Sequence, residues 1–244
     1  MRLKSALRRG VAAAVIAGIV VSSGIPAYAI QWNIADGDIT VKAGDEGTNR
    51  VTQGKTIEQE DRDTVITGKS EEHTVTIDTS KGNVDVTFDD LKIDVSGKTE
   101  GDVSDETEVD GSGDSPVDAG KAAVTVQGDH DAAIELDGAN ELKSGSHNAG
   151  LEKNGHESSG KLTIKDDNDT KGSLTAEGGK DGAGIGGGIH RDGLDLAISG
   201  GDVKATGGLG GAGIGGGGSG GNATVTITGG AVIEKASGGG GCAG

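Results

Sequence analysis

Acidic and amide side chains at one place in this sequence have the spacing of a calcium-binding loop. Four residues occupy positions 1, 3, 5 and 12 of such a loop: Asp166, Asn168, Thr170 and Glu177. Carboxylate and amide oxygens are the ligands that Ca²⁺ prefers, but Lys171 stands where the loop needs a glycine for its sharp turn. We therefore name Asp166, Asn168 and Glu177 as the predicted calcium ligands. The departure at Lys171 favours the alternative, which is an acidic turn without metal.

No arrangement of residues in this sequence points to an enzyme. The five histidines lie apart, without the His-Glu-x-x-His spacing of a zinc protease, and no Gly-x-Ser-x-Gly elbow or Ser/His/Asp grouping indicates a hydrolase. A secreted polysaccharide lyase would combine clustered carboxylates with a basic residue, and the only arginines after residue 29 are Arg50, Arg62 and Arg191. We predict no catalytic residue and no cofactor other than calcium. A lyase is the least favoured function.

The elements that must position these side chains follow an internal repeat. The phrase Gly-Ala-Gly-Ile-Gly-Gly-Gly occurs at 182–188 and again, 29 residues later, at 211–217. The flanks repeat in step, because Leu-Ala-Ile-Ser-Gly-Gly at 196–201 returns as Val-Thr-Ile-Thr-Gly-Gly at 225–230. A third copy begins at Ala231. A fixed period of this length is the signature of a repeat architecture.

Each repeat contains three short apolar segments separated by glycine-rich corners, which indicates one coil of three strands. Coils of this kind stack about 4.8 Å apart through strand hydrogen bonds. Val225 and Ile227 should then lie over Leu196 and Ile198. The sequence predicts an all-β fold, a right-handed parallel β-helix with coils of about 29 residues. Two alternatives stay open: an antiparallel β-sandwich, and a glycine-rich chain that is mostly disordered.

Composition divides the chain into four parts. Residues 1–29 are predicted to be a signal peptide, and residues 30–95 to form N-terminal β-helix coils. Residues 96–120 combine acids with Gly, Ser and Thr, and we expect a disordered acidic loop because such a segment buries too little to offset its ordering entropy. Residues 121–244 are predicted to form the glycine-rich coils. They end inside the third copy of the repeat, as a truncated reading frame would.

The first 29 residues and the net charge predict location and partners. A basic start, an apolar run at 11–21 and Ala-Tyr-Ala at 27–29 form a secretory signal peptide. The run is shorter than the roughly 18 residues of a membrane anchor, so we predict a secreted protein of the cell surface with no membrane span after cleavage. The formal net charge of −17 repels nucleic acid and anionic lipid. We expect a monomer without a nucleic-acid partner, and Cys242, the single cysteine, makes no internal disulfide.

Several segments resemble the glycine-rich repeats of bacterial cell-surface, adhesin-like proteins, which are often described as carbohydrate-binding domain-containing proteins. Leu-Thr-Ile at 162–164, Gly-Ser-Leu-Thr-Ala at 172–176 and the two glycine-rich phrases carry the resemblance. The segment Val-Thr-Phe-Asp-Asp-Leu-Lys-Ile at 86–93 is similar to one of their coils, with Asp90 where members usually have Asn.

The resemblance covers residues 30–95 and 121–244 and implies a surface-exposed right-handed β-helix that binds polysaccharide. Members usually continue into further repeats and a wall anchor, and no Leu-Pro-x-Thr-Gly signal occurs here. From the residues and the resemblance together we predict a secreted structural or adhesive module with polysaccharide or cell-wall glycan as its partner. The alternative is a passive stalk or spacer of a larger surface protein.

Overall fold

The computed structural model describes residues 30–97, 120–155, 159–193, 195–221 and 223–237. The predicted signal peptide, most of the predicted acidic loop and the end of the third repeat copy lie outside these residues, so those predictions stay open. Among the described residues the only helical elements are two single 3₁₀ turns, η1 (Ile34–Asp36) and η2 (Asp45–Gly47). The prediction of an all-β chain is confirmed.

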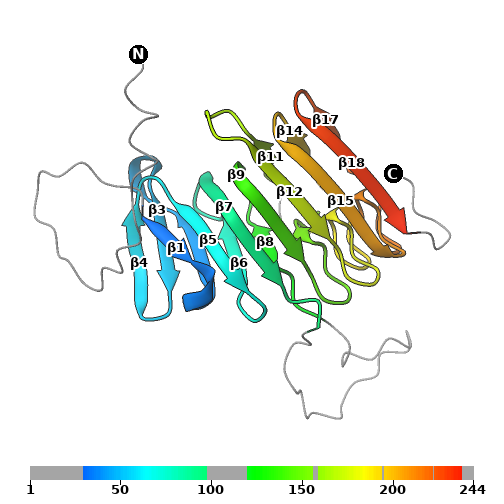
Figure 1. Ribbon diagram of the computed structural model, residues 1–244, viewed down its shortest axis with the longest axis horizontal. Helices are drawn as coiled ribbons and strands as arrows, with labels where there is room; N and C mark the ends of the chain where they lie inside the picture. The colour runs from blue at the N-terminus through cyan, green and yellow to red at the C-terminus, as the bar shows by residue number, and fades with distance from the viewer. Residues whose placement is uncertain (1–29, 98–119, 156–158, 194, 222, 238–244) are drawn as a thin grey trace, which may run out of the picture.

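The described strands form two sheets, and the strands succeed one another along an elongated body in chain order, from the blue end to the red end of Figure 1. The first sheet contains β1 (Gln31–Asn33), β5 (Val65–Ser70), β7 (Val84–Asp94), β9 (Ala132–Lys143), β11 (Leu162–Lys165), β12 (Gly172–Glu177), β14 (Leu196–Ile198), β15 (Asp202–Leu209), β17 (Val225–Ile227) and β18 (Ala231–Ser237). The second contains β2 (Ile39–Ala43), β3 (Asn49–Gln53), β4 (Thr56–Asp61), β6 (Val75–Asp78), β8 (Val124–Gln127), β10 (Leu151–Glu152), β13 (Ile185–Gly186) and β16 (Ile214–Gly215).

Neighbouring strands come from successive repeats and run parallel in the predicted register. Strand β14 pairs with β17 so that Leu196 lies beside Val225 and Ile198 beside Ile227. Strand β12 pairs with β15, and β15 with β18, through the same 29-residue step. In the second sheet β13 pairs with β16, which places Ile185 beside Ile214. Identical positions of the repeat therefore form continuous ladders, as expected.

Parallel pairing excludes the antiparallel sandwich as the arrangement of the described strands. The strand order in the first sheet is β1-β5-β7-β9-β11-β14-β17, with β12, β15 and β18 continuing the same rows, and all its pairs are parallel. Among the described residues antiparallel pairs occur only where β3 joins β2 and β4. The coarse architecture is therefore two long, mainly parallel sheets.

Side chains alternate between a narrow core and the outer surface. In β12 the inward residues Leu174 and Ala176 are buried, while their neighbours Thr175 and Glu177 are only partly covered. Buried side chains from both sheets form a single cluster. Phe88 is the largest of the fully buried side chains. Short strands with small inward residues explain why a chain of this length manages with few aromatic residues.

The N-terminal end of the stack differs from the sequence prediction. Residues 30–95, predicted to form N-terminal β-helix coils, begin with β1 and β2, which belong to different sheets and do not pair with each other. The antiparallel strands β3 and β4 were not predicted. Trp32 Nε1 on β1 donates a buried hydrogen bond of 2.8 Å to Asp61 Oδ2 on β4, which fastens this hairpin to β1.

Glycine is required where equivalent strands of successive repeats touch. Gly186 has a φ of 134°, and a Cβ at this position would lie 1.9 Å from the carbonyl oxygen of Gly215. Gly215 repeats the conformation one repeat later, with a φ of 140°. Residues with a Cβ rarely adopt this backbone conformation. The glycine-rich phrase thus allows the backbone of one repeat to contact the next closely.

Candidate functional site

A groove of about 190 Å³ lies against one end of the first sheet, over β7, β9 and β11. Its lining comes from the segment before β5, from these three strands and from the turn after β11. The lining side chains include Arg62, Asp85, Thr87, Glu135, Lys165 and Asp167. They are polar or charged, so the groove suits a polar ligand.

The parallel register builds this groove from residues that are far apart in the sequence. Thr87 on β7 pairs with Glu135 on β9, and Glu135 pairs with Lys165 on β11. Adjacent strands lie about 4.8 Å apart, so these three side chains form one row across three strands. Asp85 lies two residues before Thr87 on the same strand and is exposed.

Glu135 is the most buried charged side chain of the groove, with 9% of it exposed. Its Oε1 accepts two backbone hydrogen bonds from the turn after β11, 3.0 Å from Asp167 N and 3.2 Å from Asn168 N. Its Oε2 is buried and has no hydrogen-bond partner. The same atom lies 3.5 Å from Lys165 Nζ, which is an ion-pair distance without hydrogen-bond geometry. One carboxylate oxygen is therefore saturated, while the other makes only an electrostatic contact.

The surroundings of Glu135 shift its pKa. Burial raises the pKa of Glu135 above its ordinary value and the negative charge of Asp167 raises it further, while the backbone N–H groups of Asn168 and Asp167 partly oppose the rise. Burial by itself would lower the pKa of Lys165, but the charges of Asp167 and Glu135 outweigh it and raise that pKa. Lys165 Nζ lies 3.5 Å from Asp167 Oδ2 as well as from Glu135. The ammonium group thus holds two carboxyl groups together at the wall of the groove.

The predicted calcium ligands are not gathered at one point. Asp166 and Asn168 lie in the turn between β11 and β12, where Asn168 Nδ2 donates a hydrogen bond of 2.6 Å to Asp137 Oδ1. Thr170, the remaining residue with loop spacing, follows in the same turn and donates its backbone N–H to Asn168 Oδ1 at 2.6 Å. Glu177 is at the far end of β12, with its Oε2 3.7 Å from Lys143 Nζ.

No group of three or more His, Cys, Asp or Glu side chains in the described part of the chain is arranged to hold a metal ion. The calcium prediction for Asp166, Asn168 and Glu177 therefore gains no support from the geometry and stays a prediction. Of these residues only Asn168 lines the groove.

Apart from Asn168, sequence reasoning did not single out the groove residues. Glu135 belongs to the predicted coils of residues 121–244, but nothing in the local pattern distinguishes it from an ordinary outward-facing acid. The one available signal is that Glu135 lies between two apolar residues that are buried, Ile134 and Leu136. This signal does not show which strands lie beside Glu135 in the sheet.

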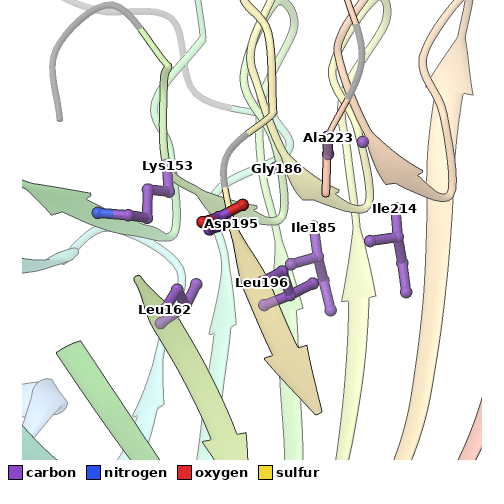
Figure 2. A pocket seen from close by; sticks show the side chains of 9 residues that line it. Lys153, Leu162, Ile185, Gly186, Asp195, Leu196, Ile214 and Ala223 are labelled. Atoms are coloured by element: carbon purple, nitrogen blue, oxygen red, sulfur yellow. The ribbon is translucent and has the colours of Figure 1, made fainter. Parts of the chain in front are cut away.

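A second, internal feature is the buried Lys153, which follows β10 and is 2% exposed. Burial lowers the pKa of Lys153 to about 8, and the charges of Asp131 and Asp129 partly oppose this shift. Figure 2 shows its side chain above the apolar side chain of Leu162, at a cavity that Asp195 also lines. The cavity measures about 10 Å³, which is room for about one water molecule. It is too small for an organic ligand.

Comparison of the chain with protein-family models, with characterised proteins and with solved structures gives no match. Among the described residues no helix is long and apolar enough to cross a membrane. The chemistry of the groove and the sequence resemblance are thus the grounds on which a function can be proposed.

Proposed function

We propose that this chain is a secreted cell-surface module, built as a right-handed parallel β-helix, that binds polysaccharide in the groove at Glu135. The parallel registers of successive repeats support the β-helix, and the usual right-handedness of parallel crossovers supports its hand. The resemblance of the glycine-rich repeats to those of bacterial adhesin-like proteins supports the surface location and the class of ligand.

The observation that carries the binding proposal is the buried Glu135 Oε2 without a hydrogen-bond partner at the wall of an otherwise polar groove. Sugar hydroxyl groups both donate and accept hydrogen bonds, and the row of Thr87, Glu135 and Lys165 offers both functions across three strands. Polysaccharide also suits an elongated sheet, because its repeating units can contact successive coils.

The affinity of the groove for one short oligosaccharide should be low. Trp32 and Phe88 are both buried, so neither offers a ring face on which a sugar could stack. Binding would then depend on a few hydrogen bonds, each of which contributes about 1 kcal/mol net. We therefore expect dissociation constants on the order of millimolar. Tight attachment to a polymer would then come from many chains bound to one surface.

A titration followed by ¹⁵N–¹H NMR tests the proposal. Soluble fragments of cell-wall and plant polysaccharides are added to the purified chain, and the amide signals of Thr87, Glu135 and Lys165 should shift in a saturable manner. Signals of β18, at the other end of the stack, should not move. A folded protein whose groove signals respond to none of the fragments would contradict the binding proposal.

The passive stalk is the second proposed function, and exposed apolar residues of the last described coil favour it. Ile227 is 53% exposed, although Ile198, one coil earlier in the same ladder, is buried. A further coil stacked on β17 would bury Ile227 in the same way. The absence of any saccharide binding in the NMR titration would leave this function. We propose no lyase activity, and incubation with polygalacturonate should release no unsaturated product.

A further inference from the structure

We infer that the groove selects neutral, hydroxyl-bearing sugar units over uronic acids, and that Glu135 determines this selectivity. The inference rests on the proposed binding of polysaccharide and adds the class of sugar. Its first ground is the state of the Glu135 carboxylate. Oε1 is saturated by the backbone N–H groups of Asp167 and Asn168, whereas Oε2 is buried, makes no hydrogen bond and has the ammonium group of Lys165 at 3.5 Å.

A buried acceptor without a donor destabilises the folded state, and a ligand group that donates a hydrogen bond removes this penalty. A sugar hydroxyl is such a donor. A uronic acid unit keeps ring hydroxyl groups that can donate as well, but its ionised carboxylate brings a like charge next to Glu135. The Glu135 carboxylate therefore discriminates between the two classes of sugar by charge.

The charge balance of the whole groove points the same way. Four carboxyl groups line it, and they belong to Asp63, Asp85, Glu135 and Asp167. Against them stand two cations, Arg62 and Lys165.

Both cations already have carboxylate neighbours in the structure. Lys165 Nζ lies 3.5 Å from Glu135 and from Asp167, and Arg62 lies 4.0 Å from Glu60. An anionic sugar would thus enter a site with excess negative charge, in which both cations already form ion pairs with carboxylates of the protein.

A bridging calcium ion would be the usual way for an acidic protein to hold an acidic polysaccharide. In the described part of the chain no group of three or more His, Cys, Asp or Glu side chains is arranged to hold a metal ion. The selectivity that we infer comes from the charge of Glu135, so we expect neither calcium nor EDTA to change it.

The row of groove side chains also has a length that suits a sugar polymer. Thr87, Glu135 and Lys165 lie on three adjacent strands, and such a row spans roughly 10 Å. The step from one strand to the next is comparable with the advance of a polysaccharide chain by one sugar unit. A chain that crosses the strands can therefore place successive hydroxyl groups near Thr87 and Glu135.

The test compares neutral hexasaccharides (maltohexaose, mannohexaose and xylohexaose) with hexagalacturonate of the same length, by NMR titration at one ionic strength. We expect at least one neutral hexasaccharide to bind at least tenfold more tightly than hexagalacturonate, with or without 1 mM CaCl₂. In Glu135→Gln the amide oxygen keeps the two backbone hydrogen bonds, and an NH₂ donor replaces the free acceptor. This variant should bind the neutral sugar at least tenfold more weakly.

Glu141→Gln is the matched control. Glu141 lies on the same strand, β9, outside the groove, and it pairs with Lys92. This variant should bind within twofold of the unmodified chain, and circular dichroism should show that both variants are folded. Tighter binding of hexagalacturonate than of every neutral sugar would overturn the selectivity while leaving polysaccharide binding intact. Unchanged neutral-sugar binding by Glu135→Gln would overturn the role of Glu135. No binding of any saccharide would overturn the proposed function itself.

Discussion

Replacing Lys153 by Met should stabilise the protein at neutral pH. Lys153 is 2% exposed, and burial is the main reason that its pKa falls from 10.5 to about 8. Met has a similar length and carries no charge, so the substitution removes the cost of burying an ammonium group and keeps most of the packing.

The size of the effect follows from the pKa. A fall from 10.5 to about 8 corresponds to about 3 kcal/mol of unfavourable burial when the group is charged in both states. Solvent screening and the loss of the contacts that Lys153 makes reduce this figure, so we expect a gain of roughly 1 to 3 kcal/mol.

The stability difference between Lys153→Met and the unmodified chain should depend on pH. Below pH 8 the folded and unfolded chains both carry the ammonium group, and the folded chain bears the full cost. Between about pH 8 and pH 10.5 the folded chain loses the proton first, so the unfolded chain binds more protons and the stability of the unmodified chain rises with pH. The advantage of Lys153→Met should therefore be largest at pH 7 and should disappear near pH 10.5.

Urea unfolding followed by circular dichroism at pH 7, 8, 9 and 10 measures this difference. Lys204→Met is the control, because Lys204 is exposed on the outer face of β15 and the substitution should change stability little at any pH. A Lys153→Met variant that is less stable at pH 7, or whose difference from the unmodified chain does not shrink as pH rises, would refute the reasoning.

Three further predictions concern a glycine contact, the core and the groove. Gly186→Ala should destabilise the fold by roughly 3 kcal/mol or more in urea unfolding, since its Cβ would strike the Gly215 carbonyl. Gly47→Asn is the control: a Cβ at Gly47 meets open space, so this substitution should change stability by less than about 1 kcal/mol. Phe88→Ala should lower the free energy of unfolding by about 3 to 5 kcal/mol in the same assay, because it removes the largest of the fully buried side chains. A smaller loss would show that the surrounding core collapses into the space that the ring leaves. The pKa of Glu135 is raised in the folded chain, which therefore holds the carboxyl proton more tightly than the unfolded chain does. Stability should fall as the pH rises from the ordinary pKa of a glutamate to the raised pKa of Glu135 in the folded chain. Glu135→Gln should remove this fall, and an unchanged pH profile would contradict it.

The strands of the glycine-rich part were predictable because the same residues recur at one fixed offset. Once Val225 and Ile227 match Leu196 and Ile198 in the sequence, stacking of like positions fixes which strands pair and in which register. The hairpin of β3 and β4 was not predictable in this way. Strand β4 is largely exposed, with Ile57 on its open surface, so pairing with β3 holds it in place and no apolar alternation reveals it.

The sequence by itself determined the strand type, the repeat period and the glycine-rich turns, because each of these depends on residues that are neighbours or that repeat at a constant spacing. Only the tertiary structure decided the groove. Thr87, Glu135 and Lys165 are separated by segments of unequal length, and they meet only because their strands occupy adjacent positions in one parallel sheet. The turn after β11 then closes over Glu135 and saturates one of its oxygens. Burial of the other oxygen is a property of three adjacent strands and the turn packed on them, and no local pattern of residues can encode it.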